Sequence, residues 1–292
     1  MESRKFKQAI LPRRKKSNFG FKLFIFLGLF FILGAAFFYI LVFSSLFKIT
    51  KIQVSGAKEV EISQIENIAA KVVDQRIFFN KIQQNNPIFS PGKIIQPIIL
   101  ENFPRIKNIN IKESFFDHIL LIDVEERIPV AIWCLVAKNE VINATSTSEV
   151  SLDNTLQAES CYYVDSAGFV FAQAPILSGG LVPIVFDRSL DYLRIKDKIS
   201  NENTIKFIID VKKELDVINL NLTDFIIQSQ TLGDLEVISP DGWKIYFDLN
   251  KPAVSQVYSL KRVLSEEVKE KRAQLEYVDL RVENRVYYKL RQ

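Results

Sequence analysis

The longest apolar segment of the chain runs from residue 23 to residue 47 and contains no charged side chain. A helix of this length would measure about 37 Å, more than the roughly 30 Å of a bilayer core. The segment is too long for the core of a signal peptide, and no Ala-x-Ala-like cleavage site ends it. The pattern predicts one membrane-spanning helix over 23–47, and a buried helix of a soluble domain is the less favoured alternative.

The charge of the N-terminal tail predicts which side of the membrane each part occupies. Residues 1–22 hold eight basic residues and one acidic residue, a net charge of +7, whereas the whole chain carries +4. Such a tail orients a single span with its N-terminus in the cytoplasm. We therefore expect a plasma-membrane protein with residues 48–292 outside the cytoplasm. The basic tail favours anionic lipid, rather than nucleic acid, as the partner of this charge.

Residues 48–127 show helix-like and strand-like periods in turn. Pro91 follows Ser90 as a first helical residue follows its N-cap, and Pro97 predicts a kink or a late start of that helix. The order strand, helix, helix, strand, strand predicts an α+β unit, with two helices on one face of a three-stranded sheet. The expected elements are a strand through Ile52 and Val54, helices over 61–73 and 91–101, a strand from Ile106 interrupted at Asn108, and a strand over 119–125.

Residues 128–292 are richer in strand patterns and are expected to form a mixed β domain with two helices. The helices are predicted over 204–217 and 252–275, where apolar residues recur at helical spacing. Turn residues at 165–168 and 239–242 predict two hairpins.

The chain has two cysteines, Cys134 and Cys161. Each lies in a strand-like segment, and the polar residues between them predict a flexible insertion over 137–160. If the two strands pair, the cysteines meet at the neck of this insertion. A disulfide suits an oxidising compartment, and two buried thiols are the open alternative.

The last two strand patterns allow two registers. A two-residue turn pairs Val282 with Arg285 and places charge on the core face, whereas a turn over Glu283–Arg285 pairs Val282 with Val286. The second register satisfies both faces, with Asn284 or Arg285 bending the loop, and predicts a final strand that is an open edge. It also pairs Leu280 with Tyr288, Val278 with Leu290, Asp279 with Lys289 and Arg281 with Tyr287.

The inventory of reactive side chains argues against an enzyme. The single histidine, His118, lies beside a predicted turn, where a structural role is favoured. Asp123 and Glu125 share one face of a strand, and a solvated face is favoured over a catalytic pair. We find no phosphate-binding loop, nucleophile elbow or metal-ligand spacing. The sequence therefore predicts no catalytic residue, metal, cofactor or small-molecule substrate.

Five short motifs follow one another between residues 49 and 281. They are Ile49-x-x-Ile52-x-Val54-x-Gly56, Phe103-Pro104-Arg105-Ile106, Glu126-Arg127-Ile128-Pro129-Val130-Ala131-Ile132-Trp133, Tyr163-Val164-Asp165-x-x-Gly168-x-Val170-Phe171 and Tyr277-Val278-Asp279-Leu280-Arg281. With the basic tail and the single span, this layout resembles the bacterial cell-division protein family FtsQ/DivIB, and the third motif is the most specific. From the residues alone, Arg127 is expected to pair with Glu125 or Glu126.

The resemblance implies a POTRA domain over 48–127, an FtsQ-type β domain over 128–292 and a scaffold role in the divisome, which builds the division septum. It further implies that the last strands bind small coiled-coil membrane proteins like FtsB and FtsL, among other divisome components, by strand addition. The runner-up function is a membrane-anchored POTRA chaperone or assembly factor for envelope proteins. The implied partner-binding residues are Arg281, Val282, Val286, Tyr287, Tyr288 and Leu290.

Overall fold

The computed structural model describes residues 19–43, 47–77, 82–83, 85–114, 117–136, 158–175, 182–199, 202–229 and 233–291. Contacts along the chain group it into two compact units. One comprises residues 1–53, 63–96 and 111–122, and the other comprises residues 54–62, 97–110 and 123–292. The expected domain border between residues 127 and 128 falls inside the second unit and stays a prediction.

The N-terminal helix, α1, spans Phe19–Phe43 and is long and apolar enough between Gly20 and Ile40 to cross a membrane. It begins and ends four residues before the predicted span, and the predicted end at Phe47 lies outside it. No part of this stretch is buried by the rest of the chain. The alternative of a buried helix in a soluble domain is therefore not supported. Residues 1–18 and the insertion over 137–157 lie outside the described residues.

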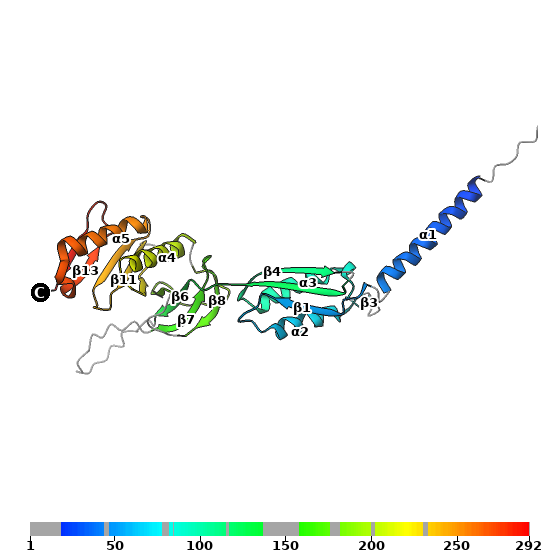
Figure 1. Ribbon diagram of the computed structural model, residues 1–292, viewed down its shortest axis with the longest axis horizontal. Helices are drawn as coiled ribbons and strands as arrows, with labels where there is room; N and C mark the ends of the chain where they lie inside the picture. The colour runs from blue at the N-terminus through cyan, green and yellow to red at the C-terminus, as the bar shows by residue number, and fades with distance from the viewer. Residues whose placement is uncertain are drawn as a thin grey trace, which may run out of the picture. The chain divides into compact units, whose positions relative to one another are not determined.

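The prediction of an α+β fold is confirmed, and a three-stranded sheet with the order β1-β5-β4 follows α1 (Figure 1). Asn108 does not interrupt its strand, and a short hairpin of β2 and β3 was not foreseen. The elements are β1 (Lys51–Ser55), α2 (Ile62–Val73), β2 (Arg76–Ile77), β3 (Ile82–Gln83), the 3-10 turn η2 (Pro87–Phe89), α3 (Pro91–Asn102), β4 (Ile106–Ser114) and β5 (Ile119–Glu126).

A nine-stranded sheet forms most of the second unit, in the order β14-β13-β12-β11-β10-β9-β6-β7-β8. Helices α4 (Glu202–Val217) and α5 (Ala253–Arg262) each connect two parallel neighbours, β9 to β10 and β12 to β13. The strands are β6 (Ala131–Val136), β7 (Ala158–Val164), β8 (Val170–Ala174), β9 (Ile184–Asp187), β10 (Asp224–Ile227), β11 (Asp234–Ile238), β12 (Lys244–Asp248), β13 (Leu275–Asp279) and β14 (Tyr287–Leu290).

Both helices pack on one face of this sheet, because a single apolar cluster joins their buried residues to the strands. Its largest fully buried side chains are Trp133, Trp243, Phe225 and Phe247. Burying a side chain of this size contributes roughly 1.5–3 kcal/mol. The cluster reaches Val278 of β13, and Leu290 of β14 packs against it only partly buried. The apolar core therefore anchors the sheet as far as β13, whereas β14 contributes little to that core.

Cys134 and Cys161 form a disulfide between directly paired residues of β6 and β7, with their Cα atoms 4.1 Å apart. The hairpin that the sequence left conditional is therefore present. Strand β7 begins at Ala158, so the last three residues of the predicted insertion are strand.

The helix predicted over 252–275 is not one α-helix. After α5 the chain continues as a π-helix, η3 (Val263–Val268), and then as a 3-10 helix, η4 (Lys269–Gln274). Leu260, Leu264 and Val268 are all buried, but no residue of η4 is. The change to a π-helix occurs within the buried part, whereas the change to a 3-10 helix at Lys269 coincides with the end of the buried residues.

Glu126 and Arg127, at the end of β5, hold three segments of the second unit together. The Glu126 carboxylate accepts hydrogen bonds from the amides of residues 58–60. Arg127 forms an ion pair with Asp165, donates to the carbonyl of Pro104 at 3.0 Å and lies over the Phe169 ring. The expected pairing of Arg127 with Glu125 or Glu126 is therefore wrong. Asp165 is 38 residues away in sequence and lies near Arg127 because β6 pairs with β7, where the amide of Val130 donates to the carbonyl of Val164.

Gly56 lies in the turn after β1 and provides a test of this packing. Its φ is +84°, and a Cβ atom there would lie 2.1 Å from the backbone oxygen of Val124. Gly242 has a similar φ of +77°, but an added Cβ atom would meet only the end of the Arg291 side chain at 3.4 Å. Gly56→Ala should therefore lower the free energy of unfolding by more than about 2 kcal/mol, and Gly242→Ala by about 1 kcal/mol.

The measurement is denaturant unfolding of the full chain in detergent, followed by the fluorescence of its two buried tryptophans. Equal losses in the two variants would contradict the close approach of β5 to Gly56.

Candidate functional site

Strand β14 is the terminal strand of the large sheet, and among the described strands it pairs only with β13. Its first three residues are exposed and Leu290 is half-buried. No other strand within the described residues lies on its outer side. At the opposite edge, residues 196–199 bond to the start of β8, through the amide of Val170 to Asp197 and the amide of Lys196 to Val170. The β14 edge is therefore the more open of the two.

The hydrogen bonds identify which backbone groups of β14 face outward. The amide of Arg291 donates to the carbonyl of Gln274 at 2.6 Å, so it points toward β13. Backbone groups alternate in direction along a strand. The amides of Tyr287 and Lys289 therefore also face β13, whereas those of Tyr288 and Leu290 face away from the sheet. These two residues offer unpaired donors and acceptors to an added strand.

The register of this hairpin differs from the prediction by two residues. Val278 lies opposite Tyr288 and Asp279 lies opposite Tyr287, and residues 280–286 form the loop. A shift of two residues preserves the faces, so Tyr288 and Leu290 still face the core side and Tyr287 the other. The bend at Asn284 is confirmed by its φ of +57°.

Arg281 explains the longer loop, because it leaves the strand to bind acidic residues. Its guanidinium forms two bonds with Asp279, at 2.9 and 2.7 Å, and one with Asp234 at 2.6 Å. It also lies over the ring of Tyr246, 4.8 Å from the centroid. The hydrogen bonds join the loop to β11 and β13, and the ring contact adds β12. The Arg281 guanidinium is thus engaged within the chain, and its role as a partner contact stays a prediction.

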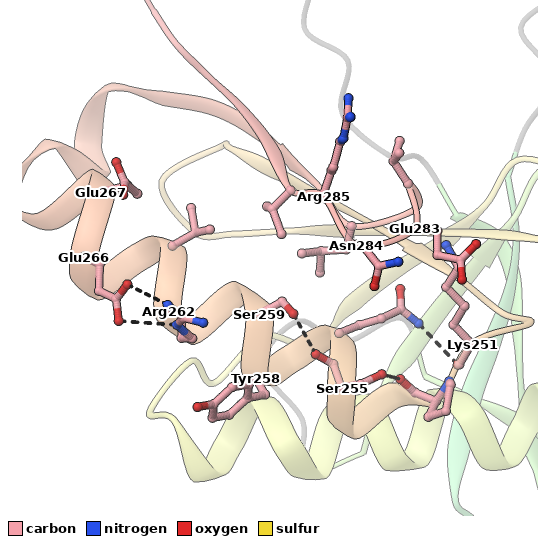
Figure 2. Close-up of a pocket in the computed structure, with 16 residues that line it drawn as sticks. Lys251, Ser255, Tyr258, Ser259, Arg262, Glu266, Glu267, Glu283, Asn284 and Arg285 are labelled. Atoms are coloured by element: carbon pink, nitrogen blue, oxygen red, sulfur yellow. Dashed lines mark hydrogen bonds and ion pairs between the residues drawn. The ribbon is translucent and has the colours of Figure 1, made fainter.

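A groove of about 550 Å³ lies between helix α5 with η3 and the loop before β14. In Figure 2, Tyr258 and the Arg262–Glu266 ion pair mark the helical wall, while Glu283, Asn284 and Arg285 mark the loop wall. Ser259 donates to the carbonyl of Ser255 at 3.0 Å and does not bridge the groove. The groove therefore extends the surface next to the β14 edge.

The structure brings five of the six predicted partner-binding residues to this region. Val282, 43% exposed, and the half-buried Val286 line the groove. Tyr288 and Leu290 carry the outward backbone groups, and Tyr287 is exposed on the other face of the sheet. The groove wall on α5 was missed. Its aromatic residue, Tyr258, is 64% exposed and lies on the groove beside Ser255, Ser259 and Arg262.

The other polar residues that the sequence singled out have structural contacts. Nδ1 of His118 lies 3.1 Å from the carbonyl of Lys48. Asp123 accepts a bond from Ser55, and Glu125 accepts one from Asn108 that, with Lys107, lowers the pKa of Glu125. Within the described part of the chain, no three His, Cys, Asp or Glu residues are grouped as a metal site requires.

Comparison of the chain with protein-family models and with curated proteins finds no match.

The Arg281 network predicts how stability depends on pH. Hydrogen bonds from Arg281 hold the pKa of Asp279 below its usual value, despite the opposing effect of burial. Because the pKa of Asp279 is lower in the folded chain than in the unfolded chain, its charge stabilises the fold. This stabilisation is fully present above the pKa of the unfolded state, about 3.9, and is lost as the pH falls through the pKa of the folded state. Asp279→Asn should therefore destabilise the chain at pH 7, and the difference from the parent should shrink below about pH 4.

Denaturant unfolding of both proteins at pH 7 and pH 3 measures this difference. Asp241→Asn, in the exposed turn between β11 and β12, is the matched control. A deficit that is equally large at both pH values would mean that the network does not act through the charge of Asp279.

Proposed function

We propose that the chain is a membrane-anchored docking protein that receives an extended segment of a partner at β14. The observation that carries this proposal is that, among the described strands, β14 pairs on one side only, with the backbone groups of Tyr288 and Leu290 directed outward. Backbone bonds to an added strand supply affinity, and side chains on the two faces supply specificity. The groove beside the strand lengthens the surface available to the same partner.

The resemblance to the FtsQ/DivIB family gives this docking role a biological setting. We propose a divisome scaffold that docks small coiled-coil membrane proteins like FtsB and FtsL. The five motifs support it, as do the single apolar helix and the α+β fold of the remainder. The basic tail supports an orientation with the N-terminus in the cytoplasm and residues 48–292 outside it.

Proline at position 288 tests the edge directly. Tyr288→Pro removes an outward amide and leaves the bonds between β13 and β14 in place, as proline does in an edge strand. Tyr288→Ala removes the same side chain but keeps the amide. In pulldowns of the full chain from native membranes, Tyr288→Pro should lose the partner, whereas Tyr288→Ala should retain more of it.

Recovery of small coiled-coil membrane proteins by the parent, and not by Tyr288→Pro, would support the division scaffold. Recovery of varied envelope proteins by all three forms would contradict it and favour an assembly factor for envelope proteins. Unchanged circular dichroism of Tyr288→Pro confirms that the fold is kept.

A further inference from the structure

The segment η4 is an exposed cationic stretch. Lys269, Glu270, Lys271 and Arg272 follow one another in it, and all six of its residues are exposed. Three basic residues and one acidic residue give it a net charge of +2. Residues 23–292 as a whole carry a net negative charge. The net charge of η4 is therefore opposite in sign to the net charge of residues 23–292.

Hydrogen bonds place η4 at the end of the β14 edge. Its last residue, Gln274, accepts the bond from the amide of Arg291, and the next residue, Leu275, pairs with Leu290. A strand added to β14 would therefore leave the edge, at the Leu290 end, beside η4. Arg291 adds a further positive charge there, although its guanidinium donates to the carbonyl of Gly242 at 3.0 Å.

The cations of η4 can be compared with Lys289 and Arg262, two nearby cations that have partners of opposite charge. Lys289 pairs with Glu276 at 2.8 Å, and Arg262 pairs with Glu266 at 3.2 Å. Within the described residues, Lys269, Lys271 and Arg272 form no ion pair. Their charge is therefore not neutralised within the described part of the chain and remains available to another molecule.

We infer that the β14 edge accepts an extended peptide whose acidic residues lie next to the segment that pairs with Leu290. This inference rests on the proposed function and names the chemistry of the partner. Opposite charges at the end of the added strand speed the encounter and fix its register. A second copy of this chain is a poorer occupant, because its β14 strand and the following Arg291 contain no acidic residue that could lie next to η4.

Synthetic peptides test the charge preference without knowledge of the natural partner. Fluorescent peptides share a core of alternating threonine and valine and carry a flank of three glutamates, serines or lysines at either end. They are titrated against the full chain in nanodiscs of zwitterionic lipid. The glutamate peptide should bind at least about fivefold more tightly than the serine peptide, and added salt should reduce this advantage.

Lys271→Glu with Arg272→Glu should abolish the preference for glutamate. The control replaces two exposed lysines of α4, Lys206→Glu with Lys213→Glu, which makes the same change in net charge and should keep the preference. Equal binding of the glutamate and serine peptides, or a preference that survives the η4 substitutions, would overturn the inference. So would a parent chain that dimerises through β14 in sedimentation.

Tyr288→Pro separates this inference from the function on which it rests. If this variant binds none of the peptides and the parent binds the glutamate, serine and lysine peptides equally, docking at β14 is supported and the charge preference is refuted. Glutamate peptides that bind Tyr288→Pro as well as the parent would refute pairing at β14. Loss of binding in Tyr288→Pro, with glutamate preferred by the parent, supports both.

Discussion

The end of the large sheet depends on the bonds that Arg281 makes with Asp279 and Asp234. This side chain crosses from the loop after β13 to β11 and covers Tyr246 of β12 on the way. Charge-assisted bonds with two points of attachment fix direction as well as distance. Because Arg281 turns toward these two aspartates, β13 ends at Asp279 and its pairing partner β14 begins only at Tyr287. The loop that results forms one wall of the groove, and β14 has one neighbouring strand within the part of the chain that the structure describes.

The two edge strands of the large sheet, β8 and β14, differ in how far other residues of the chain cover them, and the proposed function depends on this difference. The chain closes over the start of β8 with residues 196–199, whereas the described residues leave β14 uncovered. Exposed edges invite unwanted pairing, and proteins usually blunt them with charge or short length. Strand β14 is short and lies beside the cations of η4. Under our proposal, an edge with these features disfavours pairing with a second copy and still accepts a strand of complementary charge.

Elements with strong periodicity could be predicted from the sequence. The helices over 62–73 and 202–217 and the hairpins at Gly168 and Gly242 needed only local patterns. The faces of the last hairpin were also predictable, because a strand repeats every two residues. Its register was not, since the sequence does not show that Arg281 binds Asp234, 47 residues away. The partner of Arg127 was missed for the same reason. The groove wall on α5 could not be predicted, because the groove exists only where a loop some twenty residues later in the chain lies opposite the helix.

The central claim is that the amides of Tyr288 and Leu290 face outward from an open edge, and residue-resolved hydrogen exchange measures it most directly. In the full chain in nanodiscs, the amides of Tyr287 and Lys289 should exchange slowly, whereas those of Tyr288 and Leu290 should exchange quickly. Equal and strong protection of all four amides in the chain alone would contradict the account, because β14 would then have a second neighbour.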